Sequence, residues 1–213
     1  MYEAHPSPAL SECFRRKPYQ GVAPERAEFL FVGLDANYAA DIEQSPIFPS
    51  LLRYHEDGPA FWRESGVHHP FLLPAYSGDG RRYHLGFAKI GFRADHADRV
   101  SFVELLHLPT VGRSRLQARD LDRTHLHRLR EAIFAGAANY IFVSAGVLRL
   151  MGKTGAFAEL DAAPVSSGGL RIVFRDRCRT VFLHLHLSNY GKFEAQLRAE
   201  AKAIAELLQC GAG

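Results

Sequence analysis

The sequence contains little cysteine, methionine or tryptophan. Its 213 residues include three cysteines, two methionines and one tryptophan. Cys13, Cys178 and Cys210 form no CxxC pair, and their separations match neither a zinc nor an iron–sulfur site. We therefore expect a reduced, cytoplasmic protein that uses no metal and no other cofactor.

Long apolar runs, repeats and a strong excess of one charge are also missing. No apolar run reaches the roughly 18 residues of a membrane-spanning helix, and residues 1–6 lack the apolar core of a signal peptide. The net charge is only +3, which permits a nucleic-acid partner without requiring one. With 47% hydrophobic residues, the chain has the composition of one globular domain over residues 1–213, and we expect a monomer with no membrane partner.

Apolar segments rich in β-branched and aromatic residues predict strands, and amphipathic segments between them predict helices. We expect strands over residues 28–34, 99–106, 139–145, 170–174 (at an edge) and 180–186, and a last helix over residues 191–208. This alternation predicts an α/β protein, a three-layer αβα sandwich around a central, mostly parallel four-stranded sheet. Residues 1–27 read as an N-terminal arm, and residues 68–93 as a loop-rich region.

Polar side chains follow the ends of the predicted strands. Asp35, Glu104, Ser144 and His186 all lie at or near such ends. In open α/β sheets, ligands bind in the crevice outside the carboxyl ends of the strands. We therefore expect Asp35 and His186 to face one cleft.

Asp35 and His186 together suit the cleavage of an N-glycosidic bond. A carboxylate orients a water molecule and stabilises positive charge on a sugar, while an imidazole donates a hydrogen bond to the departing base. The structural alternative is that Asp35 caps a helix and that His186 is a core histidine. A third possibility is a metal-dependent hydrolase built on Asp35, His184 and His186. His68 and His69 are expected to be exposed histidines.

Short motifs around these residues resemble those of the uracil-DNA glycosylase superfamily, over roughly residues 28–195. GLDANY at residues 33–38 matches the family motif GQDPYH at its glycine and aspartate, and HLSNY at residues 186–190 matches HPSPL at its histidine and serine. Phe48 lies thirteen residues after Asp35, the separation of a family phenylalanine. AFWRESG at residues 60–66 is similar to a segment of the mismatch-specific branch.

The resemblance implies a fold like that of uracil-DNA glycosylase and a role for each matched residue. Asp35 would position the attacking water, His186 would stabilise the departing base, and Phe48 would stack on the extruded base. The remaining substrate-binding positions that it implies are Gly33 and Leu34 in the pocket wall, Asn37 and Tyr38 where the family excludes methylated pyrimidines, Ser188 at a phosphate, Asn189, and Tyr190 as a wedge.

Glu104 is the main departure from the family pattern, because uracil-specific members have a base-reading asparagine there. An ionised carboxylate only accepts hydrogen bonds, so Glu104 suits a base that presents donors, or it must be protonated. We expect a monofunctional DNA glycosylase of base excision repair, acting on single- or double-stranded DNA. The alternative is a non-catalytic module that binds a nucleotide or nucleic acid on the same fold.

Overall fold

Short strands alternate with helices along the chain, and a computed structural model describes residues 2–112, 115–160, 165–167 and 169–210. The strands are β1 (Glu3–Ala4), β2 (Tyr19–Gly21), β3 (Phe29–Gly33), β4 (Ala36–Tyr38), β5 (Val100–Glu104), β6 (Pro109–Val111), β7 (Tyr140–Ser144), β8 (Val165–Ser167), β9 (Leu170–Arg175) and β10 (Thr180–His184). The α-helices are α1 (Pro8–Arg16), α2 (Phe48–Glu56), α3 (Gly58–Ser65), α4 (Arg81–Ala88), α5 (Arg123–Phe134), α6 (Ala145–Thr154) and α7 (Glu194–Cys210). Short 3₁₀ helices are η1 (Pro24–Arg26), η2 (Ile42–Gln44), η3 (Pro70–Leu72), η4 (Ala94–Arg99), η5 (Ala118–Asp120), η6 (Ala158–Leu160) and η7 (Gly191–Phe193).

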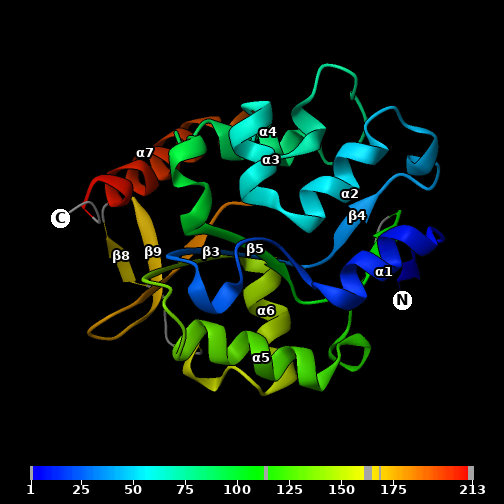
Figure 1. Ribbon diagram of the computed structural model, residues 1–213. Coiled ribbons are helices and arrows are strands. Elements are labelled where there is room, and N and C mark those ends of the chain that lie inside the picture. Colours follow the sequence, from blue (N-terminus) through cyan, green and yellow to red (C-terminus); the bar gives the residue numbers. More distant parts are fainter. Residues whose placement is uncertain (1, 113–114, 161–164, 168, 211–213) are drawn as a thin grey trace.

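A mixed sheet lies at the centre of the fold (Figure 1). Over the described residues it has seven strands in the order β2-β5-β3-β7-β10-β9-β8. The pairs β5–β3, β3–β7 and β7–β10 are parallel, whereas β2, β9 and β8 join antiparallel. The chain is therefore an α/β protein. Its sheet is larger and more mixed than the four-stranded sheet expected, and β9 is not at the edge because β8 pairs with it.

Helices cover both faces of this sheet (Figure 1). On one face, α5 and α6 bury aliphatic side chains such as Leu129 and Met151 against Val32 and Val143. On the other face, α3, α4 and α7 pack against a layer that is rich in phenylalanine. Continuous apolar strands of this kind are typical of parallel sheets that are buried on both sides.

A row of phenylalanines crosses the four parallel strands and fixes their register. Phe31 of β3 stacks on Phe142 of β7 with ring centroids 4.7 Å apart, and on Phe102 of β5 at 5.5 Å. Phe142 in turn stacks on Phe182 of β10 at 5.5 Å. Each contact joins direct register partners. A slip by one residue would turn these rings to the opposite face, so the row also keeps the carboxyl ends of the strands level.

Two segments are more ordered than the sequence suggested. The first, described from residue 2 to residue 27, is built into the fold: β1 pairs with β6, and β2 extends the main sheet beside β5. Strands β1, β6 and β4 form a second, three-stranded sheet in that order. The second, residues 68–93, contains η3 and α4.

Within the described part of the chain, no helix has both the length and the apolar character to cross a membrane.

Candidate functional site

The ends of β3, β5 and β10 meet at one pocket of about 250 Å³. Gly33 and Glu104, the last residues of β3 and β5, are direct register partners. Asp35 follows β3 by two residues, and His186 follows β10 by two residues. The pocket is lined by Gln20, Gly33, Leu34, Asp35, Ala36, Asn37, Tyr38, His69, Phe71, Gly80, Tyr83, His84, Phe102, Glu104 and His186. Asp35 and His186 therefore face one cavity, as the sequence predicted.

Hydrogen bonds from the small sheet orient the carboxylate of Asp35. Thr110 of β6 donates its hydroxyl to Asp35 Oδ2 at 2.6 Å. Asn37 Nδ2 donates to Thr110 Oγ1 at 3.2 Å and also to the carbonyl of Gly112. Asp35 is not a helix N-cap, because strand β4 follows it. The relay from Asn37 through Thr110 holds the carboxyl group of Asp35 at the pocket.

Glu104 lies over the backbone of Gly33. A Cβ atom on Gly33 would come within 1.9 Å of Glu104 Oε2, so the carboxyl occupies the space that a side chain at residue 33 would need. Burial, followed by the negative charge on Asp35, raises the pKa of Glu104 to about 8. At neutral pH Glu104 therefore carries a proton and can both donate and accept a hydrogen bond.

His186 stands at the exposed mouth of the pocket. Ser188 donates its hydroxyl to His186 Nδ1 at 2.7 Å and its backbone N–H to the same atom at 3.4 Å. The ring of Tyr83 lies beside the imidazole with centroids 5.3 Å apart. Loss of hydration lowers the pKa of His186, and the charge on Asp35 opposes this shift. Since Nδ1 accepts, the neutral ring carries its proton on Nε2, which is free to act as a donor.

Aromatic and imidazole rings form the opposite wall of the pocket. His69 stacks on His84 with centroids 3.6 Å apart, and His68 Nε2 is 3.1 Å from His84 Nδ1. All three rings are buried, so the expectation that His68 and His69 are exposed is wrong. Burial lowers the pKa of His84 to about 3, and lowers the pKa of the other two as well. The rings of this wall are therefore uncharged at neutral pH.

The aromatic ring expected from Phe48 is not among the residues that line the pocket. Phe48 begins α2 and packs against an apolar cluster that contains Ile42 and Leu51. Phe71 supplies the pocket wall instead, and its ring stacks on Tyr76 at 4.4 Å. The separation along the chain matched the family phenylalanine, but the helical start at residue 48 takes that side chain elsewhere.

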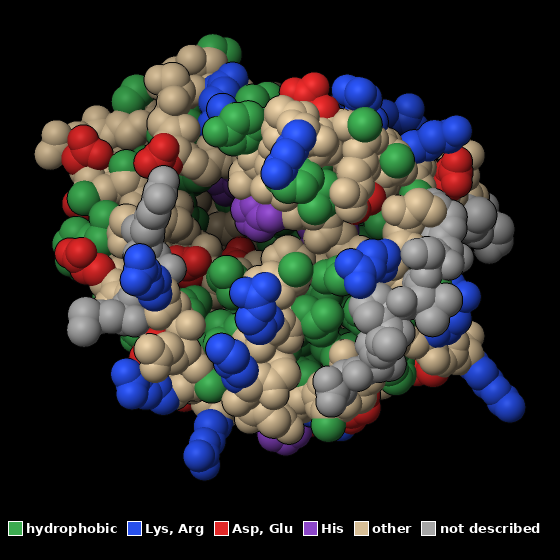
Figure 2. All heavy atoms as spheres, turned by 180° about the vertical axis from the view of Figure 1, so that it is seen from behind, with side chains coloured by type: hydrophobic (Ala, Val, Ile, Leu, Met, Phe, Trp, Pro, Cys, Tyr) green, Lys and Arg blue, Asp and Glu red, His purple; other side chains and the backbone are tan. Residues whose placement is uncertain are grey.

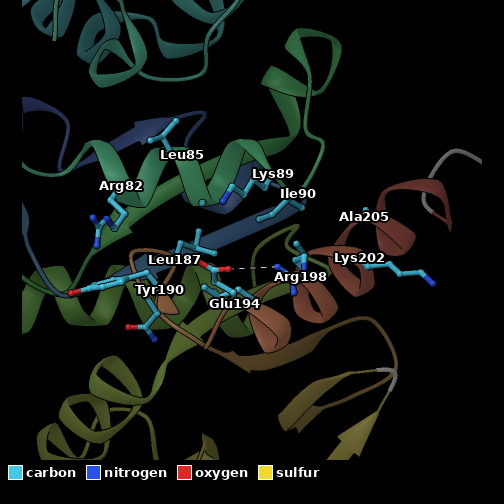
Figure 3. A pocket seen from close by; sticks show the side chains of 14 residues that line it. Arg82, Leu85, Lys89, Ile90, Leu187, Tyr190, Glu194, Arg198, Lys202 and Ala205 are labelled. Carbon is cyan, nitrogen blue, oxygen red and sulfur yellow. Dashed lines mark ion pairs between the residues drawn. The ribbon is translucent and has the colours of Figure 1, made fainter. Parts of the chain in front are cut away.

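The end of the loop after His186 belongs to a neighbouring groove between α4 and α7 (Figure 3). This α4–α7 groove has a volume of about 730 Å³ and is lined by Arg82, Leu85, Gly86, Lys89, Ile90, Leu187, Asn189, Tyr190, Glu194, Leu197, Arg198, Ala201, Lys202 and Ala205. Tyr190 is 67% exposed, and the Arg82 guanidinium lies 4.2 Å from its ring centroid. Asn189 and Tyr190 thus lie beside the pocket, and Ser188 supports His186.

His184 does not join His186 and Asp35 in a metal site. It is buried at the end of β10, near Phe31 and Phe142, and burial lowers its pKa to about 4. Among the residues that the structure describes, no group of three His, Cys, Asp or Glu side chains is arranged to hold a metal ion.

Compared with known proteins, the chain matches no family model and no curated protein.

Several residues of the pocket carried no clear sequence signal. Thr110, which donates a hydrogen bond to Asp35, follows a proline in the three-residue strand β6. Tyr83 and His84 lie in a region that reads as loop in the sequence. Phe71 follows the pair His69-Pro70 at the start of a short 3₁₀ helix. Adjacent histidines within an aromatic stretch are the one available hint, because such rings are often buried together.

Proposed function

We propose that the chain is a DNA glycosylase that hydrolyses the N-glycosidic bond of a damaged or mismatched base, on a fold related to the uracil-DNA glycosylase superfamily. The observation that carries this proposal is the placement of Asp35 and His186 at one pocket that is also lined by aromatic and imidazole rings. A volume of about 250 Å³ suits a single base, since pockets for larger ligands usually range from about 300 to 1,000 Å³.

Each of the two groups has a distinct part in the reaction. Asp35, held by Thr110, is placed to orient the attacking water and to stabilise positive charge that develops on the sugar. His186 offers its Nε2–H to the base, which leaves with negative charge. Fixed donors and charges of this kind typically contribute about 10²–10³ in rate per contact. The reaction needs only water and the two side chains.

The charge around the pocket supports a polyanionic substrate. Arg82, Lys89, Arg198 and Lys202 line the α4–α7 groove, where Glu194 pairs with Arg198 at 3.7 Å. Lysine and arginine side chains are also spread around a central hollow on the face in Figure 2. Phosphate contacts from such residues provide the sequence-independent part of DNA binding.

The test is the release of a base from labelled oligonucleotides that carry uracil, hypoxanthine, xanthine or a mismatched pyrimidine. Alkali cuts the strand at any abasic site that forms. We expect Asp35→Asn and His186→Ala each to lose a factor of about 10² or more. Glu206→Gln changes an exposed carboxylate on α7 and serves as the control. Equal turnover by all four proteins would refute the assignment, whereas DNA retention without any abasic product would indicate the binding module.

A further inference from the structure

Glu104 is the one carboxyl of the pocket to which the proposed reaction gives no role. It closes β5, opposite Gly33, and its carboxyl lines the cavity. No hydrogen bond to this carboxyl is found within the described residues, although its own backbone carbonyl lies 2.7 Å from His125 Nε2. A polar group that faces a base-sized cavity in this way is available to a ligand.

We propose that Glu104 is the base-reading residue and that it works as an undissociated carboxylic acid, donating its O–H to the base while its C=O accepts an N–H. The ligand class is a planar heterocycle with an acceptor and an N–H next to each other on one edge. This inference deepens the proposed function. It rests on that function only in assuming that the base belongs to DNA.

The arrangement of charge determines which carboxyl holds the proton. Asp35 and Glu104 share one small cavity, and two carboxyls at such a site do not both ionise readily. Thr110 donates its hydroxyl to Asp35, whereas no hydrogen bond to the carboxyl of Glu104 is found within the described residues. The other titratable groups that line the cavity are Tyr38 of β4, His69 before η3, Tyr83 and His84 of α4, and His186 after β10.

None of these other groups stabilises a negative charge on Glu104 at neutral pH. Burial raises the pKa of Tyr38 and Tyr83, and it lowers the pKa of His69, His84 and His186, so all five are neutral. Lysine and arginine are absent from the described residues that line the cavity. The raised pKa of Glu104 follows from the same surroundings.

An acid group reads a wider range of bases than a fixed amide does. Its proton can sit on either oxygen, so it can pair with a lactam edge, as in uracil, or with an amidine edge, as in cytosine. Once ionised it has no proton to donate, and one of the two hydrogen bonds is lost. Base binding should therefore weaken as Glu104 loses its proton, and a ring methylated at the N–H should not bind well at any pH.

The experiment measures binding of 1-methyluracil, 1-methylcytosine and 1,3-dimethyluracil by calorimetry between pH 6 and pH 9. The N1 methyl group takes the place of the sugar, so only the edge of the base that contains N3 can pair with Glu104. For the wild type we expect 1-methyluracil and 1-methylcytosine affinities within about tenfold of each other, and both about tenfold weaker at pH 9 than at pH 7. Glu104→Gln retains a donor and an acceptor, so its affinities should not change with pH. Glu104→Leu should bind neither base, and Glu206→Gln should behave as the wild type does.

The outcomes separate this inference from the proposed function. Wild-type binding that is independent of pH or strengthens toward pH 9, or that ignores N3 methylation, would overturn it, as would unaltered binding by Glu104→Leu. A complete lack of base binding also overturns it, whether or not abasic sites form. Conversely, pH-dependent base binding without any abasic product would support the role of Glu104 and reject the glycosylase.

Discussion

The proton on Glu104 should be measurable through stability alone, without any substrate. The pKa of Glu104 lies at about 8 in the folded protein, against an ordinary value of 4.5. A group whose pKa is raised on folding contributes its full stabilisation at pH values below its pKa in the unfolded chain. That stabilisation is lost as the pH rises toward its pKa in the folded protein. Each pH unit in that window lowers the free energy of unfolding by about 1.4 kcal/mol. The raised pKa of Glu104 therefore destabilises the wild type at neutral pH relative to pH 5.

Glu104→Gln removes this titration and keeps the shape of the side chain. Between pH 5 and pH 7.5, the unfolding free energy of the variant should rise by about 3 kcal/mol relative to the wild type. Comparing the two proteins at each pH cancels the buried histidines, which titrate identically in both. Urea unfolding followed by circular dichroism at five pH values measures the difference, and Glu206→Gln should show no such trend. A constant difference would mean that Glu104 is ionised in the folded protein.

Three further changes probe the surroundings of the same site. Gly33→Ala should push the Glu104 carboxyl out of place and weaken 1-methyluracil binding, measured by calorimetry, by about tenfold or more. Gly146→Ala is the control and should leave binding unchanged, because its new Cβ would lie 3.7 Å from Leu34 Cδ1, an ordinary contact. Because the pKa of His184 is lowered to about 4, the wild type loses stability as the pH falls from 6.5 toward 4. His184→Leu removes this loss, so its unfolding free energy relative to the wild type should be about 2 kcal/mol higher at pH 5 than at pH 7.5, as measured by urea unfolding. Thr110→Val removes the hydroxyl that orients the aspartate, and should lower kcat of base release at least tenfold with little change in KM; an unchanged kcat would exclude that positioning role.

The four parallel strands were predictable because each is a short apolar run that ends at a polar residue. Phe31, Phe102, Phe142 and Phe182 occupy equivalent positions in those runs, and their stacking determines which strand ends lie level. The placement of Asp35 beside the other strand ends follows from this register. The apolar runs and the polar residues that follow them therefore contained most of the information about where the site lies, whereas the strand order, with β7 between β3 and β10, did not follow from the sequence.

The wall and the floor of the pocket were less predictable, for physical reasons. Strands of two or three residues, such as β4 and β6, have too few positions to show an alternating pattern. The wall comes from a stretch rich in proline and glycine, where buried histidines such as His69 have the composition of a loop. Phe48 shows a further limit, since a separation along the chain does not determine direction once a helix begins at that residue.

The small three-stranded sheet gives the carboxyl groups of Asp35 and Glu104 different hydrogen-bonding surroundings at one cavity. Asn37 of β4 and Thr110 of β6 are register partners, and this pairing brings the threonine hydroxyl to Asp35. Glu104 lies on the larger sheet, over Gly33, and receives no such donor within the described residues. Hydrogen bonding to the charged form favours ionisation, and burial without it disfavours ionisation. The junction of the two sheets thus places two carboxyl groups at one cavity, Asp35 held by a hydrogen bond and Glu104 buried without one, which suits the separate roles proposed for them in attack at the sugar and recognition of the base.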